Sequence, residues 1–184
     1  MNYYIDISFQ SDEEIPIYFV RNKVYTKLHK ALCDLKASDI GVSFPEVDVK
    51  FGKVLRIHGT SDRLNELQYL NWLGGLNGYC DVSEIKPVPE TGVYYRTVSR
   101  IQSSMTQAKL RRLIKRNNLS DDDIKAYKAR MFAQSLDLPY LELFSTRRKK
   151  LYRRYLQHGE LKNSPVKGNF DQFGLSKNAT IAWF

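Results

Sequence analysis

Cysteine, histidine and long apolar runs are scarce in this sequence, and each scarcity excludes a class of site. The 184 residues include two cysteines, Cys33 and Cys80, and three histidines, none of them at the spacing of a CxxC or HExxH metal motif. No apolar run approaches the roughly 20 residues that span a bilayer, and MNYYIDISF has no signal-peptide pattern. We therefore expect a cytoplasmic protein with two reduced thiols that binds no metal ion, no cofactor and no membrane.

Acidic residues are also scarce, but only in the second half of the chain. Residues 1–95 hold 10 Lys/Arg and 13 Asp/Glu, a net charge of −3, whereas residues 96–184 hold 19 Lys/Arg and 7 Asp/Glu, a net charge of +12. Such a basic half is typical of a protein that binds nucleic acid or an anionic membrane. Its carboxylates form no paired arrangement, which argues against two-metal nuclease chemistry.

The densest group of cations lies in KLRRLIKRNN, residues 109–118. At about 100° per residue the apolar residues Leu110, Leu113 and Ile114 form one stripe. The opposite arc holds four cations: Arg111, Arg112, Lys115 and Arg116. An ordinary exposed helix would mix charges of both signs, and a membrane-binding helix would need a wider apolar face. We therefore expect a helix at about 107–118 that binds nucleic acid.

The first half of the sequence predicts the order βαββαβ of a ferredoxin-like domain. Strands are expected at 3–9, 39–44, 53–59 and 79–85, and helices at 15–35 and 61–73. The first helix has Val20, Val24, Leu28 and Leu32 at helical spacing, and Ser61 or Asp62 caps the second. The segment KPVPETG at 86–92 is rich in proline, so a domain boundary is expected there, after a ferredoxin-like domain at residues 1–90.

The second half, residues 91–184, predicts a smaller basic α/β domain, which makes the whole chain α+β. Residues 93–102 are strand-like, and the arginine-rich helix at about 107–118 follows. A second helix begins at LSDDD, where Ser120 caps a first turn rich in acids. Further strands are expected at 140–145 and 149–160, as a hairpin, and at the C-terminus.

Each of the three histidines has a simple structural role open to it. His58 alternates with Arg56 in a predicted strand, and His158 ends another. His29 lies late in the first helix, beside its apolar stripe, where a structural or surface role is the more common one. Metal-free RNA cleavage, however, needs only a base for the 2′-hydroxyl and polar groups to hold the phosphate. Neutral imidazole is the natural base near pH 7, so His29 with a nearby serine or threonine would meet this need.

Several motifs occur together in a combination that is specific: KLHKAL, VSRIQ, LRRLIKRNNLS, LELFSTRRKKLYRRYLQHG, GLSK and the terminal WF. Together they resemble the CRISPR repeat-processing endoribonucleases of type I-F systems, over essentially the whole chain. The resemblance implies an enzyme that cuts CRISPR precursor RNA, without metal, at the 3′ base of the repeat stem-loop. The 2′-hydroxyl attacks, which leaves a 2′,3′-cyclic phosphate and a 5′-hydroxyl. The enzyme then stays on the product hairpin with other protein subunits of the type I-F RNA-guided surveillance complex, and it is monomeric when alone.

The resemblance also implies a role for individual residues. His29 resembles the catalytic base, and Ser145 the serine that positions the ribose. Arg100 and Gln102 resemble a pair that reads base edges at the foot of the stem, and Tyr152 stands where the family has a phenylalanine stacked on the terminal base pair. The helix expected in the RNA major groove contributes Arg111, Arg112, Lys115, Arg116 and Asn117, the last in place of a histidine. Phe173 replaces a tyrosine often found before the GLSK turn, so we expect no catalytic role for it.

Two other interpretations share the charge pattern and the expected fold. A non-catalytic ferredoxin-like RNA-binding protein would explain both, but it would not explain the combination of motifs. A DNA-binding regulator is less well supported, because no helix-turn-helix pattern is clear. Incubation with a CRISPR-repeat hairpin in EDTA, followed by inspection of the product ends, would separate the three.

Overall fold

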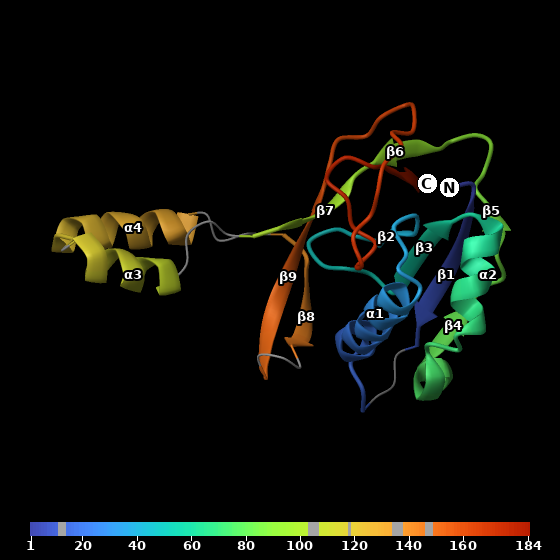
Figure 1. Cartoon of the computed structure of the whole chain (residues 1–184), viewed down its shortest axis with the longest axis horizontal. Coiled ribbons are helices and arrows are strands. Elements are labelled where there is room, and N and C mark those ends of the chain that lie inside the picture. The colour runs from blue at the N-terminus through green and yellow to red at the C-terminus, as the bar shows by residue number, and fades with distance from the viewer. Residues whose placement is uncertain (11–13, 103–106, 118, 134–137, 146–148) are drawn as a thin grey trace.

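The computed structural model describes residues 1–10, 14–102, 107–117, 119–133, 138–145 and 149–184. These residues form an α+β protein whose sheets are antiparallel (Figure 1). One sheet lies in the first half of the chain, and two smaller sheets are built from the second half. Within the described ranges, no helix has the length and apolar character needed to cross a membrane.

The first sheet is built around the first strand of the chain. Its elements are β1 (Tyr3–Phe9), α1 (Ile17–Asp34), β2 (Gly41–Ser43), β3 (Val54–Gly59), α2 (Ser61–Tyr69) and β4 (Cys80–Val82). β1 lies between β3 and β4, β2 pairs with the far edge of β3, and a short β5 (Lys86–Pro87) pairs with the start of β1. The strand predicted at 3–9 is confirmed: Ile5, Ile7 and Phe9 point into the core while the alternate residues are partly exposed.

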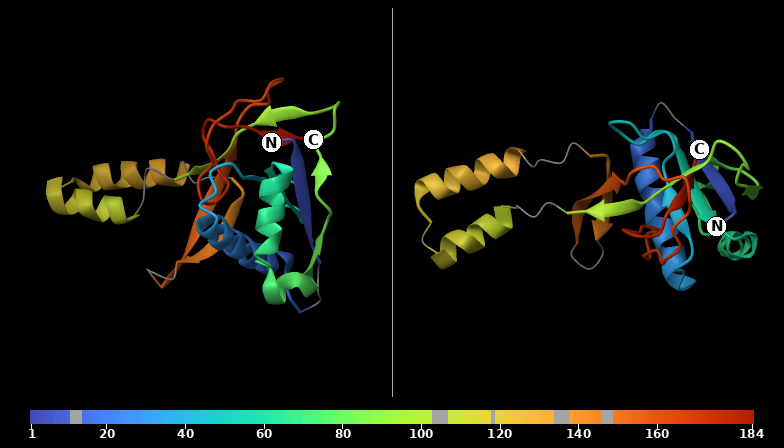
Figure 2. Two further views of the ribbon diagram at one scale, coloured as in Figure 1. Left: turned by 45° about the vertical axis from the view of Figure 1, so that its right-hand side comes forward. Right: turned by 90° about the horizontal axis from the view of Figure 1, so that it is seen from above.

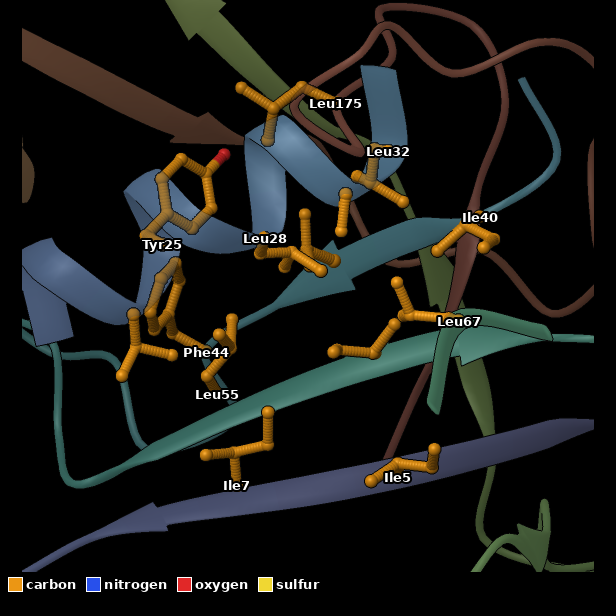
Figure 3. Close-up of a cluster of buried hydrophobic side chains, with 14 of the residues drawn as sticks. Ile5, Ile7, Tyr25, Leu28, Leu32, Ile40, Phe44, Leu55, Leu67 and Leu175 are labelled. Atoms are coloured by element: carbon orange, nitrogen blue, oxygen red, sulfur yellow. The ribbon is translucent and has the colours of Figure 1, made fainter. Parts of the chain in front are cut away.

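Helix α1 packs its apolar stripe on this sheet. Val20, Val24, Leu28 and Leu32 are each at most 3% exposed, as their spacing predicted. Figure 3 shows Leu28 and Leu32 above the buried side chains of β1 and β3. His29 follows Leu28 by one residue, or about 100° around the helix, so it lies at the border of the buried stripe and is half-buried.

The C-terminal segment lies against α1 and β2. Phe170, Leu175 and Ile181 are buried in the same apolar cluster as the first half of the chain. The backbone N–H of Val42 donates to the carbonyl of Gly174 at 2.9 Å. Gly174 has a φ of +69°, and a Cβ there would collide with Val42, so this approach requires glycine. The core is therefore shared by both halves, and the domain boundary at 86–92 stays a prediction.

Residues 93–102, which were predicted to be strand-like, form two strands. The structure has β6 (Tyr94–Arg96) and β7 (Val98–Ile101), which belong to different sheets. β6 pairs with β10 (Ile181–Trp183), and β7 pairs with β9 (Lys150–His158). The partner changes at Thr97, whose carbonyl accepts the N–H of Gly159 at 2.9 Å. Local alternation cannot reveal such a break, because the two partners come from distant parts of the chain.

One face of the sheet β7-β9-β8 packs against α1. β8 (Tyr140–Ser145) and β9 form the predicted hairpin, and β8 contacts α1. Residues opposite one another in register share a face, and on this face Leu141, Leu143 and Leu156 are buried. The same register places Arg100, Ser145, Tyr152 and Arg154 on it, together with Lys150 and His158.

The two helices predicted in the basic half are confirmed as α3 (Gln107–Asn117) and α4 (Asp121–Ala133), which pack on each other. Residue 118, the expected end of the first, lies outside the described residues. The Ser120 hydroxyl caps α4 by accepting the N–H of Asp123 at 3.2 Å. The apolar stripe of α3 is only partly covered, since Leu110 is 2% exposed and Ile114 is 37% exposed. Figure 2 shows the pair apart from the sheets.

The predicted cap of the second helix is wrong by one residue. Thr60, rather than Ser61 or Asp62, is the N-cap of α2, and its hydroxyl accepts the N–H of Arg63 at 3.3 Å. β3 ends at Gly59, so the chain turns into the helix directly after the strand. A 3-10 turn, η1 (Gly74–Tyr79), occupies residues beyond the end of α2.

His58 should make the protein less stable in acid. It is fully buried, its Nε2 lies 2.8 Å from Oγ of Ser43, and burial lowers its pKa to about 3. The pKa in the unfolded chain is about 6.5, so the stability that neutral His58 contributes is complete above that pH and is lost as the pH falls toward 3. Between neutral pH and about pH 5 this loss should reach about 2 kcal/mol. Urea unfolding at both pH values should show a smaller loss for His58→Gln than for the wild type, and equal losses would contradict this.

Candidate active site

The ring of His29 is held at one nitrogen by the C-terminal segment. Its Nδ1 lies 2.8 Å from the carbonyl oxygen of Gln172. A carbonyl oxygen only accepts, so Nδ1 carries the proton, and Nε2 of the neutral ring keeps its lone pair. The side chain is half-buried. This is the tautomer in which Nε2 can act as a base toward an incoming ligand.

Cys33 lies one helical turn from His29 and supports the same segment. Its thiol donates to Oε1 of Gln172 at 3.2 Å. Burial, and then the carboxylate of Asp34, raises the pKa of Cys33, so the thiol stays protonated at neutral pH. It therefore orients Gln172 and does not compete with His29 as a base. Both cysteines, Cys33 and Cys80, are free thiols, as expected.

The ring of Phe173 separates His29 from the guanidinium group of Arg154. The His29 ring stacks on Phe173 with 3.6 Å between centroids and 9° between planes. The guanidinium carbon of Arg154 lies 3.4 Å from the same centroid. Two groups this close to one centroid cannot share a face, so they contact opposite faces of the ring. The Tyr25 hydroxyl donates to the carbonyl of Phe173 at 2.8 Å and anchors the ring in place.

Ser145 and Tyr152 lie on the sheet face that packs against α1. Ser145 is the last residue of β8 and is directly followed by residues 146–148, which lie outside the described residues. Tyr152 pairs with Leu143 and packs half-buried against the core. The structure thus places both residues on the side of the sheet that faces the helix carrying His29, while their roles stay predictions.

Arg100 and Gln102 line one side of a polar hollow. Its volume is about 800 Å³, and its wall also includes Gln157 and Lys177. Arg100 is half-buried on β7, and burial, followed by the nearby guanidinium of Arg154, lowers its pKa from the usual value. Gln102 follows β7 and is exposed. Amide and guanidinium groups in such a hollow can hydrogen-bond to the edges of bases.

The structure does not bring α3 to the His29 ring. Figures 1 and 2 show α3 and α4 on the far side of β8 and β9 from α1. Five predicted RNA-binding residues are exposed on α3: Arg111, Arg112, Lys115, Arg116 and Asn117. The described α3 therefore presents a cationic surface separate from the candidate base.

Sequence reasoning missed Gln172 and Arg154. Gln172 acts on His29 through its backbone, and a backbone carbonyl leaves no signal in the residue type. Arg154 could have been found, because it alternates with Tyr152 and Leu156 along β9 and so had to share their face.

Comparison with known proteins identifies the family of this chain. A family model described as CRISPR-associated protein (Cas_Csy4) matches residues 4–184. Two relatives are named CRISPR-associated endonuclease Cas6/Csy4. The one from Escherichia coli (strain UTI89 / UPEC) is 38% identical over 185 residues, and the one from Pseudomonas aeruginosa (strain UCBPP-PA14) is 35% identical over 188 residues; both alignments cover 100% of each chain.

A more distant likeness links the chain to a solved structure described as "Structure A of CRISPR endoribonuclease Cse3 bound to 19 nt RNA". That alignment covers 100% of both chains, with a TM-score of 0.40 and 12% identity. The family model and the two relatives each match essentially the whole chain. The chain therefore belongs to the Cas_Csy4 family of CRISPR-associated proteins, which confirms the resemblance seen in its motifs.

Proposed function

We propose that this protein is a metal-independent endoribonuclease that cuts CRISPR precursor RNA at the 3′ base of the repeat stem-loop and then stays on the product hairpin. The observation that supports it best is the tautomer of His29, whose Nδ1 is tied to a backbone carbonyl, so that Nε2 of the neutral ring keeps its lone pair. The names of the two relatives, both CRISPR-associated endonucleases, support the substrate class.

In the proposed reaction the RNA supplies its own nucleophile. Nε2 of His29 takes the proton of the 2′-hydroxyl, and O2′ attacks the adjacent phosphorus. The P–O5′ bond breaks, O5′ takes a proton from solvent, and His29 returns its proton to solvent, so the products carry a 2′,3′-cyclic phosphate and a 5′-hydroxyl. Ser145 holds the ribose so that O2′ and O5′ lie in line across the phosphorus. Nearby cations stabilise the charge that develops on the phosphate.

Recognition of the hairpin is divided between two surfaces in this proposal. The major groove of A-form RNA is too deep and narrow for its bases to be read, but exposed cations on α3 can line its phosphates. Arg100 and Gln102 read base edges at the foot of the stem, and the Tyr152 ring stacks on the terminal pair. All of these contacts come from the proposed basic domain at 91–184, whereas the proposed base His29 belongs to the proposed ferredoxin-like domain at 1–90. The protein works in the cytoplasm, where it joins other subunits of the type I-F complex.

Cleavage should need no divalent ion. In the proposed reaction a side chain acts as the base and the RNA is the nucleophile, so EDTA should leave the rate unchanged and added magnesium should raise it at most slightly. The measurement is the single-turnover rate on a repeat hairpin in EDTA and in magnesium, with hairpin folding checked in both. Loss of activity in EDTA that magnesium restores would show that the mechanism is wrong.

A further inference from the structure

Arg154 is a buried cation with no counter-ion among the residues that the structure describes. It is 4% exposed, and its Nε is buried without a hydrogen-bond partner. None of the ion pairs among the described residues includes it. A buried charge normally requires a partner, because loss of hydration is costly. Stacking on Phe173 compensates for only part of that loss. The guanidinium is therefore suited to bind an anionic group of a ligand.

The neighbouring residue on the same strand shows the ordinary arrangement. Arg153 points to the other face of the sheet, where it is exposed and pairs with Glu142 at 3.4 Å. Its guanidinium carbon lies 4.5 Å from the ring centroid of Tyr140. Of these two adjacent arginines, the exposed one therefore has a carboxylate partner, and the buried one has none within the described part of the chain.

Arg154 opens onto a pocket that is rich in positive charge. The pocket has a volume of about 460 Å³ and lies beside the Phe173 ring. Its charged lining residues are Lys36, Arg100, Arg154 and Asp171. Oδ1 of Asp171 already accepts the backbone N–H groups of Phe173 and Leu175, at 2.8 and 3.0 Å. The pocket lining thus has three cations and one carboxylate, and one oxygen of that carboxylate already accepts two hydrogen bonds within its own turn.

We propose that Lys36 and Arg154 bind one backbone phosphate of the RNA, next to the phosphate that is cut, while Arg100 at the pocket wall keeps its contact with the base edges. The inference rests on the proposed function, and it adds a contact that fixes the path of the strand through the site. Arg154 and His29 contact opposite faces of one ring. The phosphate held by Arg154 therefore belongs to a neighbouring nucleotide, and Arg154 is a positioning residue rather than a catalytic one.

The test is a scan of single phosphates. Repeat hairpins carry 2′-deoxyribose at the cut site, which keeps them intact, and one neutral methylphosphonate at each position around the cut. At one position the substitution should weaken binding to the wild type roughly 10- to 100-fold, as expected for a lost charged hydrogen bond. Arg154→Leu should show the same loss with normal phosphates and no further loss at that position.

Two further variants make the outcome decisive. Arg153→Leu, the matched control, should respond to the scan as the wild type does. Lys36→Gln alters an exposed residue, so it should fold even if Arg154→Leu does not. The methylphosphonate at the same position should weaken its binding less than it weakens that of the wild type. If every methylphosphonate weakens the binding of Arg154→Leu and Lys36→Gln as much as it weakens that of the wild type, the inference is overturned.

A failure of the proposed function would look different. A wild type that binds the all-ribose hairpin but leaves it intact would contradict the cleavage mechanism, even if one phosphate proves linked to Arg154. If the wild type cuts normally, but no methylphosphonate position loses its effect in Arg154→Leu or Lys36→Gln, only the proposed phosphate site would be contradicted.

Discussion

Replacing His29 with alanine should lower the rate of hairpin cleavage roughly 10²- to 10⁴-fold, the usual effect of losing a general base. Affinity for the hairpin should stay close to that of the wild type, since the cations of α3 and the pair Arg100 and Gln102 are untouched. The helix should also remain intact, because His29 lies at the border of the buried stripe and alanine is a good helix former. The measurement is the single-turnover rate together with the Kd of a non-cleavable hairpin.

His158→Gln provides the matched control. His158 is half-buried, its pKa is lowered to about 4 by burial, and its ring packs T-shaped on Trp183 with 5.4 Å between the ring centroids. It should therefore keep the cleavage rate within a few fold. Added imidazole should restore part of the rate to His29→Ala and leave the control unchanged. An equal loss of rate and affinity in His29→Ala would mark His29 as a structural residue.

Neutralising Arg112, Lys115 and Arg116 together to glutamine should weaken binding to every hairpin, roughly 100-fold or more at moderate salt. The three side chains are exposed on one helix, so the change removes phosphate contacts and little packing. The dependence of log Kd on log salt should become shallower, by about 0.9 for each lost contact. Discrimination between a cognate stem and one with its bottom pair changed should persist.

Arg100→Ala should instead reduce the discrimination between the cognate stem and the stem with its bottom pair changed. A bidentate base contact is worth about 1–3 kcal/mol of discrimination, so the gap between the two stems should narrow. The control for the α3 variant lies on the adjacent helix: changing Lys125, Lys128 and Arg130 of α4 to glutamine removes the same charge from exposed positions. This control should lose far less affinity. If the α3 variant loses discrimination while Arg100→Ala loses only uniform affinity, the two roles are reversed.

Elements with a strong internal pattern were predictable from the sequence. β1 matches its predicted bounds, and α1 differs from its prediction by two residues at the start and one at the end. In both, the apolar period matches the geometry of the element, so the pattern and the fold agree. The cap at Ser120 was also predictable, because the hydroxyl and the acids of the first turn are local to it.

The centre of the candidate site was not predictable, because it depends on contacts between distant residues. His29 and Gln172 are 143 positions apart, and their bond joins a helix to a turn near the C-terminus. The β6–β7 break has the same cause, since each strand has its partner elsewhere in the chain. The pairing of Arg154 with Phe173 also requires the folded sheet. Local periodicity contains none of this information.

The product ends of the cleaved hairpin test the central claim most directly. Wild-type protein is incubated in EDTA with a repeat hairpin, and both fragments are weighed by mass spectrometry. A second hairpin with 2′-deoxyribose at the nucleotide 5′ of the cut is the control. We predict a 2′,3′-cyclic phosphate on one fragment and a 5′-hydroxyl on the other, with the control uncut. A 3′-hydroxyl with a 5′-phosphate, or cleavage of the deoxy control, would contradict 2′-hydroxyl attack assisted by His29.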